Sequence, residues 1–96
     1  MSNPTDQVTN NQEKYRFEII SGSQISKLEY RMGRDRIALV HTEVPDDLQG
    51  QGLGSTLVKA ALNYAKEKEL KVLPYCPFVA AYLERHPEYQ DIVAEI

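Results

Sequence analysis

The first half of the chain alternates apolar and polar residues, a pattern typical of strands. In residues 15–19 and 28–32 every second residue is apolar and the residues between are charged, which predicts two strands with one buried face each. Residues 37–40 are apolar throughout, so a third strand with both faces buried is expected to begin there. The short glycine-containing turns at residues 21–23 and 33–35 join these strands into a predicted antiparallel three-stranded meander.

The second half of the chain changes to the longer period of a helix. Residues 53–68 place apolar side chains three or four positions apart, which predicts an amphipathic helix packed on the sheet. Residues 71–75 predict a short strand, and a strand reached through a helix commonly runs parallel to its predecessor. Residues 79–85 predict a short second helix that ends before Pro87. The predicted fold class is therefore α+β (α/β), with a meander, a glycine turn, a helix, a parallel strand and a short C-terminal helix.

Length and composition limit both the architecture and the function. The 96 residues suffice for one domain, assigned to residues 14–96, whereas the polar residues 1–13 lack periodicity and predict a disordered tail. A net charge of -3 argues against a nucleic-acid partner, and no apolar run reaches the length of a membrane span. The N-terminus does not resemble a secretory signal and the single Cys76 cannot form an internal disulfide, so a cytoplasmic location is expected. We expect a monomer or weak homodimer and no metal site.

The stretch Gln49-Gly50-Gln51-Gly52-Leu53-Gly54 carries the strongest chemical signal. It stands between the third predicted strand and the long predicted helix. Glycine allows a positive φ and a close approach of another group, and a helix N-terminus offers unpaired N–H groups at the positive end of its dipole. A strand, a glycine-rich turn and a helix start together predict a site for a phosphate or pyrophosphate.

Two common phosphate-binding turns fit this stretch poorly. A P-loop has a lysine before its Ser or Thr, but here Gly54 is followed directly by Ser55 and Thr56. A dinucleotide-binding turn reads G-x-G-x-x-G and is followed about 20 residues later by an acidic residue. This chain has G-x-G-x-G, and residues 71–73 at that distance are basic or apolar.

The turn instead resembles the Q/R-x-x-G-x-G/A signature of the Gcn5-related N-acetyltransferase superfamily. The blocks His41-Thr42-Glu43-Val44-Pro45, Cys76-Pro77-Phe78 and Arg85-His86-Pro87-Glu88-Tyr89 are similar to those of a small single-domain acetyltransferase-like subfamily, so that the resemblance covers residues 15–93. It implies acetyl-coenzyme A as cofactor, with its pyrophosphate on the backbone amides of the turn. The cofactor-binding residues that it implies are Val44, Gln49, Gly50, Gln51, Gly52, Leu53, Gly54 and Ser55.

His41 and Glu43 are the candidates for a general base. Acetyl transfer needs a neutral acceptor amine, and an ammonium with a pKa of about 10.4 must first lose a proton. The two residues share one face of the third strand because side chains alternate, and either group is able to accept the proton directly or through water. The alternative interpretation is that both are rim residues at a strand end.

Cys76 and Tyr82 complete the candidate catalytic set. Cys76 is expected at the end of the short parallel strand, where it would act as a nucleophile that takes the acetyl group, line the thiol end of the cofactor, or serve as a small buried hydrophobe. A helix N-terminus near Phe78 and the nearby His41 would lower its pKa. The resemblance implies that Tyr82 protonates the departing coenzyme A thiolate; the alternative is a tyrosine of the core.

These residues predict an acetyl-coenzyme A-dependent N-acetyltransferase that acts on an unidentified amine. The superfamily carries two helices after its first strand that cover the acceptor, whereas the turn at residues 21–23 is too short to contain them. That difference motivates an alternative, a non-catalytic acyl-coenzyme A-binding or regulatory module. A third interpretation is that a partner or a second copy completes the acceptor pocket.

Overall fold

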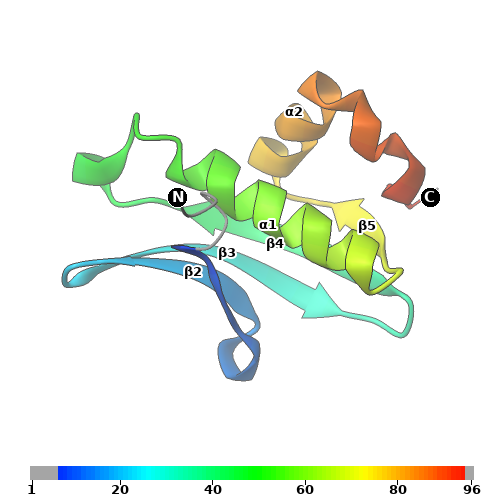
Figure 1. Ribbon diagram of the computed structural model, residues 1–96, viewed down its shortest axis with the longest axis horizontal. Coiled ribbons are helices and arrows are strands. Elements are labelled where there is room, and N and C mark those ends of the chain that lie inside the picture. The colour runs from blue at the N-terminus through cyan, green and yellow to red at the C-terminus, as the bar shows by residue number, and fades with distance from the viewer. Residues whose placement is uncertain (1–6, 95–96) are drawn as a thin grey trace.

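A five-stranded mixed sheet is the frame of the molecule (Figure 1). The computed structural model describes residues 7–94. The strands lie across the sheet in chain order: β1 (Thr9–Asn11), β2 (Arg16–Ser21), β3 (Gln24–Met32), β4 (Arg36–Glu43) and β5 (Lys71–Pro74). Strands β1 to β4 pair antiparallel, and β5 pairs parallel to β4. The predicted meander and the predicted parallel strand are both confirmed.

The helices lie on one side of the sheet. Helix α1 (Leu53–Glu67) runs across the face formed by β2, β3 and β4, and α2 (Pro77–Arg85) follows β5 beside it (Figure 1). The fully buried residues of α1 follow the predicted apolar row and pack against the sheet: Leu57, Val58, Ala61, Leu62 and Ala65. Within the described part of the chain, no helix is long and apolar enough to cross a membrane.

The C-terminal segment closes the edge of the sheet beyond β5. Helix α2 begins at Pro77, two residues before the predicted start, because proline is well suited to the first position of a helix. The 3-10 helix Pro87–Ile92 follows, and Val93 then forms a parallel bridge with Val72 of β5. This segment contributes the buried Tyr89 and Ile92 to the core.

A β-bulge in β4 changes which side chains face α1. Tyr30 of β3 pairs with Leu39, but the preceding Glu29 pairs with His41, so Val40 is an extra residue on β4. A bulge of this kind shifts the alternation of side chains beyond it. Leu39 and Thr42, three residues apart, consequently share the face that α1 covers.

The prediction of a disordered tail is wrong for residues 7–13. Residues 9–11 form β1, which pairs with β2, and Gln12–Lys14 form a 3-10 turn. Side-chain contacts hold this segment: the Tyr30 hydroxyl donates to the Asn10 carboxamide at 2.7 Å, and Asn11 Nδ2 donates to Glu18 at 3.2 Å. Residues 1–6 of the predicted tail lie outside the described part of the chain.

Candidate functional site

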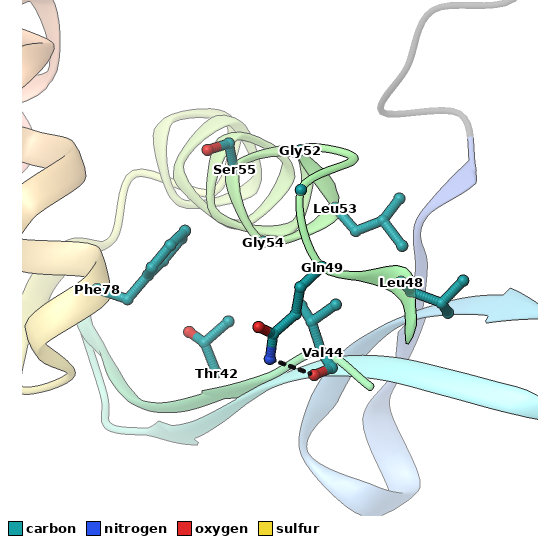
Figure 2. Close-up of a pocket in the computed structure, with 10 residues that line it drawn as sticks. Thr42, Val44, Leu48, Gln49, Gly52, Leu53, Gly54, Ser55 and Phe78 are labelled. Atoms are coloured by element: carbon teal, nitrogen blue, oxygen red, sulfur yellow. Dashed lines mark hydrogen bonds between the residues drawn. The ribbon is translucent and has the colours of Figure 1, made fainter. Parts of the chain in front are cut away.

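A cavity of about 440 Å³ lies where the end of β4 meets the start of α1. Its walls come from β4, from the connection between β4 and α1, from the first turn of α1, and from the first turn of α2 (Figure 2). The lining residues are Thr42, Val44, Leu48, Gln49, Gly50, Gly52, Leu53, Gly54, Ser55 and Phe78. None of these side chains is charged, and a mixed apolar and amide lining suits a ligand with apolar and hydrogen-bonding parts.

The three glycines of the turn are required at their positions for different structural reasons. Gly50 and Gly52 have φ values of +88° and +77°, a conformation that is costly for residues with a Cβ. Gly54 lies inside the helix, where an added Cβ would be 2.8 Å from Cζ of Phe78. Gly54 is therefore needed for the close packing of α1 against α2, while the first two glycines turn the chain into α1.

The first turn of α1 directs unpaired donors toward this region. Gly52 is the N-cap residue and supplies no side-chain acceptor, and within the described residues the N–H groups of Leu53, Gly54 and Ser55 have no hydrogen-bond acceptor. The Gln49 side chain reaches across and donates to the Val44 carbonyl at 3.3 Å (Figure 2). Unpaired amides at the positive end of a 15-residue helix favour an anion.

Cys76 lies behind the cavity at the start of α2. Its thiol is buried, and Sγ is 3.4 Å from the Thr42 hydroxyl, which faces it because of the β4 bulge. Burial alone would raise the pKa of Cys76, but hydrogen bonds from the Thr42 hydroxyl and from the N–H groups of Val79 and Phe78 outweigh burial and lower it. The thiolate is thus favoured relative to an ordinary cysteine, by Thr42 and α2 rather than by His41.

His41 and Glu43 lie on the opposite face of the sheet from the cavity. Both are exposed, and they share this face as the alternation predicts. Glu43 Oε2 is 3.4 Å from Lys27 Nζ, and His41 pairs across the ladder with Glu29. The structure therefore does not bring these two residues together with Cys76, since the bulge points Thr42 toward the cavity instead.

Tyr82 lies one helical turn beyond Phe78 on α2 and lines a second cavity. Its ring stacks on His86 with 4.1 Å between the ring centroids. Burial, with Tyr89 and Glu88 nearby, raises the pKa of Tyr82, so its hydroxyl stays protonated at neutral pH. It does not line the first cavity.

The eight residues expected to hold the cofactor lie together more closely than the four expected to be catalytic. All eight except the exposed Gln51 line the first cavity. Sequence reasoning did not assign the lining residues Thr42, Leu48 and Phe78. Thr42 and Phe78 stand inside the blocks that carried the resemblance, but the bulge that turns Thr42 inward leaves no mark in the sequence. Across residues 7–94, no three potential metal ligands cluster.

Comparison with known proteins agrees with this geometry. Residues 16–92 match the family described as GCN5-related N-acetyl-transferase. The protein NATD1 is 38% identical over 56 residues in Homo sapiens and 36% identical over 56 residues in Xenopus tropicalis. Each match covers 58% of this chain and about half the length of the relative. The solution structure of a GCN5-like protein from Staphylococcus aureus superimposes with a TM-score of 0.73 at 31% identity, covering 100% of this chain and 93% of the other.

Proposed function

The chain belongs to the GCN5-related N-acetyl-transferase family, and on that premise we propose that it binds acetyl-coenzyme A and transfers the acetyl group to an amine. The cavity at the start of α1 carries this proposal. Its unpaired amides and its lack of carboxylates suit the pyrophosphate, and its apolar walls at Val44 and Phe78 suit the pantetheine arm.

The split between β4 and β5 supports the position of the pantetheine arm. Pairing of the two strands ends at Leu39 and Pro74, while β4 continues to Glu43. Backbone groups of β4 beyond Leu39 are consequently not paired with β5, and they are able to bond the pantetheine amides. The thioester would then lie near the paired side chains of Thr42 and Cys76.

Two routes of transfer are consistent with this arrangement. In the first, the amine nitrogen attacks the thioester carbonyl carbon and coenzyme A leaves as its thiolate. In the second, the Cys76 thiolate first attacks that carbon and releases coenzyme A, and the amine then takes the acetyl group from Cys76. The lowered pKa of Cys76 supports the second route. Tyr82, which was expected to protonate the departing thiolate, lines the second cavity and not the first, so neither route assigns it that role.

The acceptor would approach from the sheet face that α1 leaves open. That face carries His41 and Glu43 at the end of β4, beyond the last pairing with β5. An amine that passes between the strands toward the thioester would meet these groups, and either is able to take its proton. Replacing each in turn, by Asn and by Gln, and measuring the pH profile of turnover tests which one is the base.

Thermal unfolding with acetyl-coenzyme A tests the binding step. At a ligand concentration 100-fold above Kd, binding adds about 2.7 kcal/mol, which raises the Tm of a domain of this size by about 10 °C or more. Gly50→Ala is expected to reduce that rise because it distorts the turn. Gly22→Ala is a matched control, since Gly22 also has a positive φ (+62°) with open space for a Cβ but lies in the β2–β3 turn. A protein that is not stabilised at millimolar ligand contradicts the proposal.

Intact-protein mass after exposure to acetyl-coenzyme A tests the covalent route. The second route predicts a gain of one acetyl group that Cys76→Ala abolishes together with turnover. Unchanged turnover in Cys76→Ala would rule out covalent catalysis and leave direct attack.

A non-catalytic acyl-coenzyme A-binding module is the second candidate function. One observation favours it: no His, Asp or Glu is among the residues that line the first cavity. Tight binding of acetyl-coenzyme A without release of coenzyme A thiol in a panel of peptides, polyamines and small amines would support this alternative over the enzyme.

A further inference from the structure

A second cavity, of about 370 Å³, lies in the groove between α1 and α2. It is lined by Ser55, Thr56, Lys59, Tyr82, Arg85 and His86. Ser55 also lines the first cavity, so the two spaces adjoin along the same helix. None of the functions proposed above requires the basic residues at this place.

The second cavity concentrates positive charge in a protein of net charge -3. Lys59 and Arg85 come from different helices and line the same space, and neither forms an ion pair within residues 7–94. The lining contains no carboxylate, although Glu88 Oε2 is 3.2 Å from Nδ1 of the lining residue His86. Arg and Lys side chains that converge without acidic partners are suited to a phosphate.

The spacing of the two cavities fits the two phosphate groups of one nucleotide. Lys59 follows Gly54 by five residues, or about 7.5 Å along the axis of α1. Tyr82 follows Phe78 by four residues, or about 6 Å along α2. The second cavity is thus displaced by about one helical turn from the first on both helices. In coenzyme A the pyrophosphate on the ribose 5′ position and the phosphate on the 3′ position are likewise one sugar apart.

We propose that the second cavity binds the 3′-phosphate of the coenzyme A ribose, with Lys59 and Arg85 as its cationic partners. The inference rests on the proposed function, because it assumes that the pyrophosphate lies at the first turn of α1. It adds a specificity: the protein distinguishes coenzyme A from dephospho-coenzyme A, which is identical except for this phosphate. Ser55, between the two cavities, is placed to contact either phosphate.

Isothermal titration with acetyl-coenzyme A and acetyl-dephospho-coenzyme A tests the inference. We expect the wild type to bind the 3′-phosphorylated form about tenfold more tightly, as charge-assisted hydrogen bonds imply. In the double variant Lys59→Ala, Arg85→Ala the two ligands should bind with nearly equal Kd, because only the phosphorylated form loses contacts. Arg34→Gln removes one exposed positive charge in the β3–β4 turn, far along the chain from both cavities, and should keep the wild-type ratio.

The outcomes separate this inference from the function on which it rests. Equal affinity of the wild type for both ligands would overturn the 3′-phosphate site and leave acetyl-coenzyme A binding intact. An equal loss of affinity for both ligands in the double variant would also overturn it, since that result indicates a general electrostatic effect. If neither ligand binds to the wild type, the proposed function itself fails. The unliganded Tm of each variant shows whether it is folded.

Discussion

The two faces of the sheet differ in the interactions that stabilise them and in the chemical groups that they present. On the face that α1 covers, Phe17, Leu28, Tyr30 and Leu39 are all at most 3% exposed. The opposite face carries a ladder of charges instead, in which Arg16 pairs with Glu18 and Lys27 pairs with both Glu29 and Glu43. The covered face provides the core, the cavity and the cysteine, while the open face provides the titratable groups.

This difference places the proposed reaction across the sheet rather than on one side of it. The first cavity, which is proposed to hold the cofactor, is lined by no charged side chain, so the proposed base must come from elsewhere. His41 and Glu43 at the end of β4 are on the open face, where the pairing with β5 has already ended. The strand split is therefore the place at which an acceptor from one face and a thioester from the other are able to meet.

Substitutions of two adjacent residues on β3 should differ most in their effect on the free energy of unfolding, because the two side chains lie on opposite faces of the sheet. Leu28 is fully buried under α1, whereas Glu29 lies on the open face with its side chain 33% exposed. Leu28→Ala is expected to lower the free energy of unfolding by about 2–5 kcal/mol because it leaves a cavity. Glu29→Ala should cost less than about 1 kcal/mol, as for an exposed ion pair. Similar losses in urea unfolding would contradict the assignment of the two faces.

The buried end of the charge ladder should make stability depend on pH. Burial alone would raise the pKa of Glu18, but hydrogen bonds from Arg16 and Asn11 outweigh it and hold the pKa below its ordinary value. A lowered pKa contributes stability that is complete above the unfolded pKa of about 4.3 and is lost as the pH falls through the folded pKa. At pH 7, Glu18→Gln should therefore be less stable by about 1 kcal/mol.

Unfolding of both proteins between pH 7 and pH 3 measures this contribution. The difference between wild type and Glu18→Gln should shrink as the pH falls below the ordinary glutamate range. A difference that stays constant across this range would show that the Glu18 carboxylate is not stabilised by folding. Glu29→Gln serves as the control for a more exposed carboxylate on the same face.

The smallest expected effect concerns Thr42 and the thiol of Cys76. Thr42→Val keeps the shape of the side chain but removes the hydroxyl that contacts Sγ, so the pKa of Cys76 should rise because one hydrogen bond to the thiolate is lost. The pH dependence of the reaction of Cys76 with iodoacetamide measures this shift. Glu43→Gln changes the neighbouring residue on the other face and should leave the profile nearly unchanged. If Thr42→Val and Glu43→Gln changed the pH dependence equally, Thr42 would not be the residue that the bulge turns toward Cys76.

Much of the fold followed from local patterns along the chain. The two-residue period predicted β2 and β3, the helical period predicted α1, and the intervening helix predicted that β5 is parallel to β4. Strand β1 was missed because its polar residues are held by distant partners, Asn10 by Tyr30 and Asn11 by Glu18. Periodicity in a short segment does not contain such long-range contacts.

The candidate site could be predicted only in part, because some of its residues are adjacent in the sequence and others are not. The glycine turn is continuous in sequence, so its residues gather at one place around the start of α1. The residues proposed for catalysis come from β4 and α2, and their relative positions depend on the extra residue Val40. That bulge turns Thr42 toward Cys76 and leaves His41 outside, which simple alternation along β4 does not predict.

Titration of isotopically labelled protein with acetyl-coenzyme A, followed by amide nuclear magnetic resonance, shows whether the glycine turn is the cofactor site. We expect the amide signals of residues 50–55 to shift most, because the pyrophosphate would accept hydrogen bonds from the first turn of α1, while the signal of Gly22 in the β2–β3 turn should stay unchanged. If the signals of residues 50–55 do not move at millimolar ligand, or if larger shifts lie on the open face of the sheet, the glycine turn is not the cofactor site.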